Sequence, residues 1–198
     1  KYGADGVRMG MLLAAPAGND ILFKEDLCKQ GANFCNKIWN AFRLVQGWQV
    51  ADIEQPQASA KAIEWMQAKM RAEVAEINDL YSKYRLNEAL MTAFKLFTDE
   101  FSGWYLEMVK PAYQAPIDRQ TLQATLHIFE DLMKVIHPFM PFITEEIYQH
   151  IADRAEGESI MTSVLTLDAP TEADAAILAS MEQAKQIISG VRAIRQSK

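Results

Sequence analysis

The chain has 198 residues and a mass of 22.4 kDa, 49% of its residues are hydrophobic, and its formal net charge at pH 7 is -6. This length is enough for one sizeable hydrophobic core and for one or two domains. No apolar run reaches the roughly 20 residues that a membrane-spanning helix needs. The first ten residues lack an initiator methionine and the residue order of a signal peptide. We therefore expect a fragment of a longer protein.

The charge is distributed unevenly along the chain. Residues 1–50 carry a net charge of +2 and residues 181–198 carry +3, whereas residues 51–110 carry -3 and residues 111–180 carry -8. Because the local field rather than the net charge steers association, an acidic protein can still bind RNA through one basic face. A polyanion would prefer the two ends of this chain. A solvated acidic globule is the alternative.

The cysteines and histidines predict neither a disulfide nor a metal site. Cys28 and Cys35 are seven residues apart, so their Cα atoms would be roughly 10 Å apart on a helix, too far for a disulfide. We expect reduced thiols and hence a cytoplasmic location. His127, His137 and His150 have no zinc-like spacing with each other or with the cysteines.

The first predicted long helix, around residues 31–45, has two contrasting faces. Its apolar stripe consists of Leu27, Phe34, Ile38 and Val45. Trp39 shares a face with Cys35 and Phe42 and is expected to pack in the core, whereas Trp48 is a candidate for stacking on bases.

The opposite stripe of this helix mixes amides with cations, and its members are Lys29, Asn33, Asn36, Lys37, Asn40 and Arg43. Such side chains can bind phosphates and ribose hydroxyls, as RNA-binding helices do. The alternative is an ordinary polar face whose amides bond neighbouring loops.

Two further long helices follow a flexible connection over residues 51–59. Residues 59–84 predict a helix roughly 39 Å long, with an inward stripe of Ile63, Met66, Met70, Val74, Ile77, Tyr81 and Tyr84. The next helix, ended by Pro111 and Pro116, has an inward stripe of Leu90, Phe94, Phe97, Phe101, Trp104 and Met108.

The remaining segments complete the predicted bundle. A helix capped by Asp118 runs to the residue before Pro138, with Leu122, Leu126, Phe129, Met133 and Ile136 pointing inward. The run "HPFMPF" should form a turn with aromatics in the core, and "PFITEEIYQHI" a short helix with Glu145 and Glu146 in its first turn. Residues 158–168 resemble a strand or an extended crossing. A last helix would point Leu178, Met181, Ile188 and Val191 inward.

These elements predict an all-α fold, an antiparallel helix bundle with a short C-terminal strand-plus-helix appendage. No phosphate-binding loop, nucleophile elbow or metalloprotease helix is present. Asp99 and Glu100 are sequence neighbours that point to different sides of a helix, as are Glu145 and Glu146, so neither pair predicts a catalytic site. We predict no catalytic residue.

Several segments together resemble one family. "YGADGVRMGMLLAAPAGNDILF", "GANFCNKIWNAFRLV", "EFSGWYLEMVKP", "HPFMPFITEEIYQHI" and "IISGVRAIRQSK" occur in the order found in class I aminoacyl-tRNA synthetases. "GNDI" followed by "NFCNKIWNA" resembles the valyl-tRNA synthetases more than their isoleucyl, leucyl, cysteinyl and methionyl relatives. The family's HIGH and KMSKS signatures are absent: "LHIFED" and "IRQSK" are only superficially similar.

The resemblance implies a division into three parts. Residues 1–23 would be the connection following the catalytic domain, residues 24–151 the helix-bundle anticodon-binding domain, and residues 152–198 a truncated extended segment and helix. The fragment would bind the anticodon stem-loop of tRNA(Val) without performing chemistry, and the parent would be a valine-tRNA ligase.

The resemblance also implies the partners and the site. ATP and Mg²⁺ would act only in the parent enzyme, whose catalytic domain is another partner, and we expect a monomer. The candidate tRNA-binding residues are Asn33, Lys37, Asn40 and Arg43. The alternatives are the equivalent domain of an isoleucyl- or leucyl-tRNA synthetase, or a helical protein-protein scaffold with no RNA role.

Overall fold

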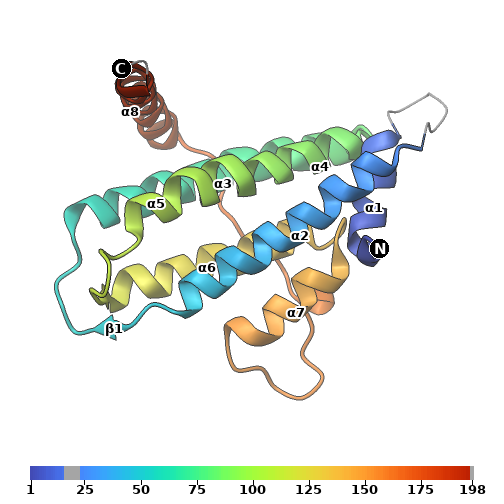
Figure 1. The fold of residues 1–198 in the computed structure, drawn as a ribbon, viewed down its shortest axis with the longest axis horizontal. Coiled ribbons are helices and arrows are strands. Elements are labelled where there is room, and N and C mark those ends of the chain that lie inside the picture. The colour runs from blue at the N-terminus through green and yellow to red at the C-terminus, as the bar shows by residue number, and fades with distance from the viewer. Residues whose placement is uncertain (16–22, 197–198) are drawn as a thin grey trace.

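The computed structural model describes residues 1–15 and 23–196, which form an almost entirely helical structure (Figure 1). Its α-helices are α1 (Gly3–Ala14), α2 (Glu25–Gln46), α3 (Gln57–Ser82), α4 (Leu86–Lys95), α5 (Leu106–Val109), α6 (Arg119–Ile136), α7 (Pro141–Ile151) and α8 (Glu172–Gln196). A π-helical section, η1 (Leu96–Tyr105), joins α4 to α5, and a 3₁₀ turn, η2 (Ile160–Thr162), precedes α8. The all-α prediction is confirmed.

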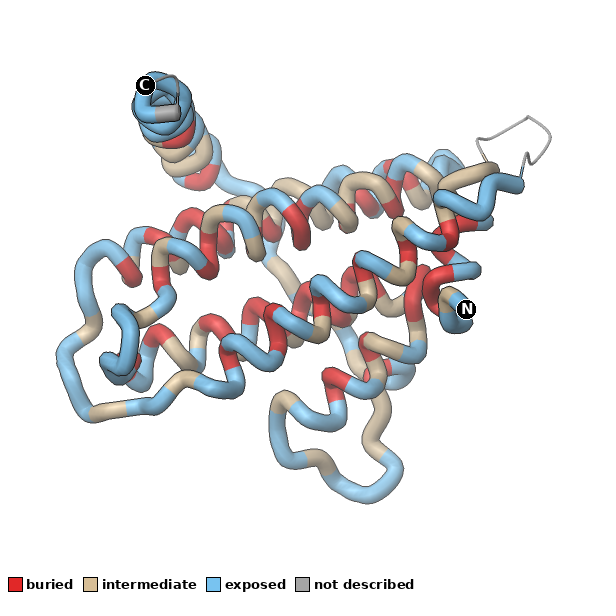
Figure 2. The backbone as a smooth tube through the Cα atoms, in the orientation of Figure 1, coloured by how far each residue is buried: buried red, intermediate tan, exposed pale blue. Residues whose placement is uncertain are grey.

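The long helices form the predicted bundle, with α3 beside the α4–η1–α5 rod and α2 beside α6 (Figure 1). Figure 2 shows that the buried residues of these helices face the interior. The core contains the fully buried rings of Phe97, Phe101 and Phe129. Helix α6 begins as predicted, because the Asp118 carboxylate accepts a hydrogen bond of 2.8 Å from the backbone N–H of Thr121.

Two short strands tie together the loops at one end of the bundle. Strands β1 (Val50–Ala51) and β2 (Ile117–Asp118) pair in parallel, with Val50 opposite Ile117 and Ala51 opposite Asp118. The loop after α2 is thereby fixed against the loop after α5.

The π-helical section changes the predicted register of the second long helix. A π-helix has a wider turn than an α-helix, so residues beyond its start rotate relative to a period of three and four. Tyr105 is therefore fully buried, and its hydroxyl shares a 2.8 Å hydrogen bond with that of Thr125. The predicted core residue Trp104 is only half-buried, and it lies against Lys185 and Arg192 of α8.

Three smaller predictions about packing are wrong. Tyr84 is exposed because the chain leaves α3 there in a left-handed conformation (φ 57°). Phe142 is exposed, although Phe139 of the same turn is buried. Helix α7 begins at Pro141, so Glu145 and Glu146 lie beyond its first turn. The acidic group at its N-terminus is Asp5 of α1, whose carboxylate accepts hydrogen bonds from the backbone N–H groups of Phe142 and Ile143.

The segment before α8 is an extended crossing with one 3₁₀ turn rather than a strand. Ser159 supports the turn through a hydrogen bond from the backbone N–H of Met161 to its hydroxyl. In α8, Leu178 and Met181 pack on the core as predicted, whereas the predicted inward residues Ile188 and Val191 are exposed. The helix projects away from the bundle, so its second half has less surface to pack against (Figure 1).

Ion pairs hold α8 to the bundle. Arg71 of α3 donates two hydrogen bonds to the Asp174 carboxylate, and Lys185 pairs with Glu100 of η1 beside the ring of Trp65. Hydrogen bonds from Arg71 and from the backbone of Thr171 lower the pKa of Asp174 below its ordinary value. The negative charge of Asp174 is therefore engaged inside the protein.

Glycines allow α1 and α2 to approach closely. A Cβ atom on Gly31 would lie 2.6 Å from the backbone oxygen of Gly6, and one on Gly10 would lie 2.7 Å from the backbone nitrogen of Cys28. Both distances are shorter than carbon can tolerate, so the two backbones are in direct contact.

Over residues 1–15 and 23–196, no helix combines the length and hydrophobicity needed to cross a membrane.

Phe101→Ala should lower the free energy of unfolding by about 3–5 kcal/mol, because it removes a fully buried ring and leaves a cavity. Urea denaturation followed by circular dichroism measures this change. The control Phe142→Ala removes a ring that is 65% exposed and should change stability by about 0.5 kcal/mol or less. A loss below about 1 kcal/mol for Phe101→Ala would contradict its place in the core.

Gly31→Ala should destabilise the protein by about 1–3 kcal/mol, because the added methyl group would force the backbones of α1 and α2 apart. The matched control is Gly190→Ala in α8, where an added Cβ has open space and should stabilise by about 0.4–1 kcal/mol. Thermal unfolding of both variants measures the two changes. Equal effects would show that the α1–α2 contact is not tight.

Candidate nucleic-acid interface

Helix α2 presents the two faces that its sequence predicts. Phe34, Ile38 and Val45 are buried, whereas Leu27 is only half-buried. We use the name polar stripe for the set of cations and amides on the other face, all of which are exposed: Lys29, Asn33, Asn36, Lys37, Asn40 and Arg43. The packing of α2 therefore leaves the polar stripe available to a partner.

The polar stripe borders two neighbouring hollows between α2 and the α4–η1–α5 rod. The first has a volume of about 420 Å³ and is lined from the rod by Phe94, Thr98 and Asp99. The second has a volume of about 400 Å³ and is lined from the rod by Ser102, Leu106 and Glu107. Asn33 and Lys37 line both hollows. A continuous groove thus runs beside α2.

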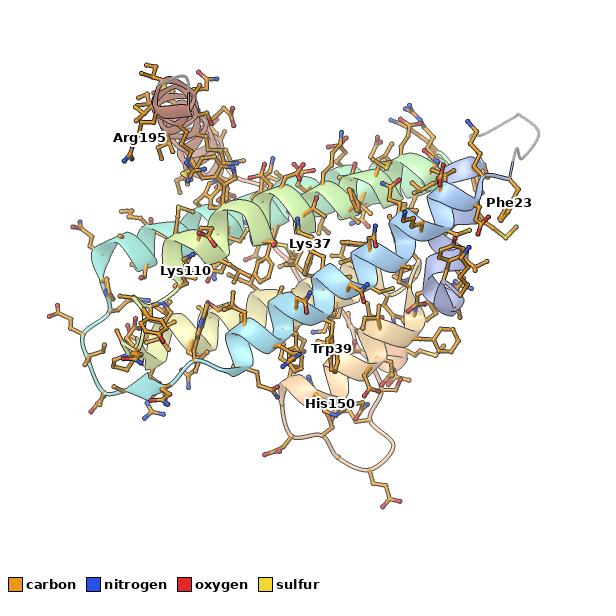
Figure 3. All side chains as sticks on the ribbon, in the orientation of Figure 1. Phe23, Lys37, Trp39, Lys110, His150 and Arg195 are labelled. Carbon is orange, nitrogen blue, oxygen red and sulfur yellow. The ribbon has the colours of Figure 1, made fainter. Side chains whose placement is uncertain are left out.

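Lys37 is held across this groove. Its ammonium Nζ donates a 3.2 Å hydrogen bond to the backbone oxygen of Thr98 in η1. Figure 3 shows Lys37 on the side of α2 that faces the rod, with Trp39 on the opposite side. An ammonium group has three donors. Lys37 can therefore keep this contact and still donate to a phosphate oxygen or a hydroxyl in the groove.

Acidic side chains also reach the groove, so its charge is mixed. Asp26 and Asp99 line the first hollow and Glu107 lines the second. Glu107 accepts a 2.6 Å hydrogen bond from Lys110, which balances its charge. By contrast, Lys29 and Arg43 form no ion pair with any residue that the structure describes. Among the three cations of the polar stripe, these two are the ones most available to an anion.

The structure brings together three of the four predicted site residues. Asn33, Lys37 and Asn40 line the groove, with Asn40 in the second hollow only. Arg43 lies six residues after Lys37, about 9 Å further along the helix axis, and lines neither hollow. Arg43 instead belongs to the last turn of α2, next to the loop that begins at Gly47.

Sequence reasoning missed the opposite wall of the groove. Phe94, Thr98, Ser102 and Leu106 come from the α4–η1–α5 rod. Their spacing of four residues follows one face of the rod, which was the available signal. Nothing in the sequence shows that this face lies against α2.

Both tryptophans are half-buried and pack against the core, and the stacking of Trp48 on bases stays a prediction. Trp39 is half-buried and its ring lies 5.8 Å from that of Phe42, which confirms packing against the core. Trp48 is half-buried at the end of α2 and lines a third hollow, between two loops.

Arg154 is not a free surface cation. Its guanidinium donates to Glu130, to Glu158 and to the backbone oxygen of Tyr148, and it stacks 3.6 Å from the centre of the Tyr148 ring. Burial opposes ionisation of Glu130, but the hydrogen bonds from Arg154 and Lys134 lower its pKa. Arg154 is therefore engaged within the fold.

The described residues offer little catalytic chemistry. Across residues 1–15 and 23–196, no group of three or more His, Cys, Asp or Glu side chains could hold a metal ion. Burial and the nearby Asp5 carboxylate raise the pKa of the Cys35 thiol to about 11, which makes it a poor nucleophile. His137 packs at the end of α6, where its Nδ1 lies 2.7 Å from the hydroxyl of Thr144.

An exposed stripe of cations and amides can bind the phosphates and ribose hydroxyls of RNA, although an ordinary amphipathic helix also has a polar face. Residues 64–198 match the family model described as the anticodon-binding domain of tRNA ligase. The chain belongs to this family. Helices α1 and α2 precede the matched residues.

Several curated relatives that match the whole chain are named valine–tRNA ligases. The chain is 60% identical over 198 residues to that of Phocaeicola vulgatus and 57% identical over 199 residues to that of Parabacteroides distasonis. It is 31% identical over 209 residues to that of Fusobacterium nucleatum. Each comparison covers 100% of this chain but only 22% to 23% of the relative. The chain therefore spans less than a quarter of these relatives.

Proposed function

We propose that this chain is the part of an ATP-dependent valine–tRNA ligase that binds the anticodon stem and loop of tRNA(Val). The family match and the names of the relatives support this proposal. The observation that carries this proposal is the polar stripe of α2, which lies exposed beside a groove. One member of the stripe, Lys37, donates a hydrogen bond across that groove to the backbone oxygen of Thr98. Residues 24–151 would form the RNA-binding bundle, residues 1–23 its connection to the catalytic domain, and residues 152–198 a further segment.

The chemical reaction itself would take place in another part of the parent enzyme. ATP and Mg²⁺ would bind in its catalytic domain, which would act in the cytoplasm on tRNA held by this bundle. We expect the ligase to act as a monomer.

The cations of the polar stripe would contact the phosphate backbone of the RNA. Lys29 and Arg43 have no competing ion pair among the described residues, and Lys37 is already oriented by η1. Binding of a phosphate by each of them would release condensed counterions, which makes the affinity depend on salt. The asparagine amides between them can donate to and accept from ribose hydroxyls.

The acidic residues 111–180 would repel RNA less than their net charge of -8 implies. Arg71, which lies outside this segment, pairs with the Asp174 carboxylate, and Asp118 accepts a hydrogen bond from a first-turn N–H of α6. Their charges are thus partly neutralised inside the protein, while the cations of the polar stripe face water.

Lys37→Glu and Arg43→Glu should each weaken tRNA(Val) binding at low salt and converge with the original protein at high salt. Each lost phosphate contact should also reduce the slope of log K against log salt by up to about 0.9. Fluorescence anisotropy with labelled tRNA across a salt series measures both effects.

The matched control for this experiment is Lys61→Glu. Lys61 is exposed, pairs with Glu64, and lines the hollow between α3 and α8 rather than the groove beside α2. The Lys61→Glu variant should therefore leave tRNA binding nearly unchanged. Equal behaviour of all three variants would mean that the polar stripe is only a solvated face.

The chain alone should show no valine-dependent exchange of pyrophosphate into ATP, because it contains no phosphate-binding loop or class I adenylation signature. The assay uses purified chain with valine, ATP and labelled pyrophosphate, and a valine–tRNA ligase preparation as positive control. Exchange above background that persists through purification would contradict the assignment to a tRNA-binding part.

A further inference from the structure

A third hollow lies at the end of the bundle where α2 and α5 stop. Its volume is about 310 Å³, and it is lined by residues 47–49 of one loop and 111–115 of the other. This volume is at the lower end of the roughly 300–1,000 Å³ that small-molecule sites occupy. A single planar group such as a nucleobase is of a size that fits there.

The two loops that form this hollow are fixed in place. The backbone N–H of Ile117 donates a 2.8 Å hydrogen bond to the backbone oxygen of Gln49, and β1 pairs with β2 immediately beyond. Gln114 has a positive φ of 62°, a conformation that residues with a side chain rarely adopt. The hollow is therefore a preformed feature of the backbone.

Two aromatic side chains line the hollow, and they differ in how far they are exposed to water. Trp48 is half-buried and packs against the core, so its position is constrained. Tyr113 is 92% exposed, which leaves a large aromatic ring in water without a packing partner. Exposed aromatic rings are the usual platforms on which proteins stack unpaired bases, and the side-chain amides of Gln49 and Gln114 lie in the same lining.

The hollow continues the polar stripe. The backbone N–H of Gly47, the first lining residue, donates to the backbone oxygen of Arg43, the last member of the stripe. Lys110 starts the other loop directly before the lining residues (Figure 3). Arg43, a cation suited to phosphates, thus leads to a site with aromatic rings and amides, whereas Lys110 on the other side already pairs with Glu107.

We propose that this hollow holds one unpaired base of the tRNA anticodon loop, stacked on Tyr113 with Trp48 beside it, and that Gln49 and Gln114 bind the edge of the base. The proposal rests on the proposed function. Bases within a duplex stem are already stacked on one another and cannot enter, whereas loop bases can unstack and do so on aromatic side chains. The site would therefore distinguish the loop from the stem.

The test compares Tyr113→Ala, Tyr113→Phe and the control Tyr84→Ala in this chain. Tyr84, like Tyr113, is an exposed tyrosine, with 84% of its surface accessible, but it lies after α3, at the other end of the bundle. The probes are the anticodon stem-loop of a valine tRNA with 2-aminopurine at each loop position in turn, and a duplex of the same stem without the loop. Anisotropy gives the affinity and 2-aminopurine emission gives the stacking.

Tyr113→Ala should weaken stem-loop binding by about 5- to 150-fold, the range expected for one lost stacking contact. It should also abolish the emission change at one loop position and leave the salt slope unchanged. Tyr113→Phe should behave as the original protein, because the ring remains, and Tyr84→Ala should have no effect. None of the variants should alter duplex binding.

The outcomes separate the two proposals. If the stem-loop binds in a manner that Lys37→Glu weakens but Tyr113→Ala does not, the stacking site is wrong and the proposed function stands. If Tyr113→Ala weakens the duplex as much as the stem-loop, Tyr113 has no role specific to unpaired bases and the stacking site is also wrong. If the original protein binds neither RNA, both proposals are overturned.

Discussion

The contact between aromatic rings in the core determines the geometry of the whole molecule. Phe101 of η1 meets Phe129 of α6 edge to face with 5.2 Å between ring centres, and Phe34 and Phe42 of α2 meet Phe97 and Phe129 in the same manner. Edge-to-face packing fixes the angle as well as the distance between rings. Three helices are thereby held at one mutual orientation, and the groove beside α2 is the outer side of this arrangement. A change at Phe101 or Phe129 would therefore alter the groove without touching any residue that lines it.

The same bundle shows how an acidic protein can offer a surface suited to RNA. Some of its carboxylates accept backbone hydrogen bonds within the fold: Asp5 binds the N-terminus of α7, and Asp118 binds the first turn of α6. Such groups contribute to the net charge but little to the outward field of the neighbouring surface. The cations of the polar stripe have fewer internal partners. Net charge alone therefore misjudges this surface, because what matters is which charges already have partners.

The sequence predicts the long helices of the bundle because each has a regular apolar stripe and a length typical of bundles, but it does not predict α1, which lies in residues expected to be only a connection. It also predicts which face of α2 is polar. It fails where the period changes or where distant segments meet. The π-helical register that buries Tyr105 instead of Trp104, the use of Asp5 as a cap for α7 and the engagement of Arg154 all depend on contacts between residues far apart in the chain. For the same reason the groove's second wall could not be predicted, and the roles of Asn33, Lys37, Asn40 and Arg43 stay a prediction.

The glycine contact between α1 and α2 has a mechanical consequence. Because Gly31 and Gly6 bring the two backbones together without intervening side chains, there is no soft layer to absorb a displacement. Asp5 fastens the same helix to α7. A displacement of α1 would therefore move α2 with it, so that the two helices move as one rigid unit. Arg43 lies at the far end of this unit, in the last turn of α2. Motion at one end of the molecule would reach the loops at the other end as a rigid rotation.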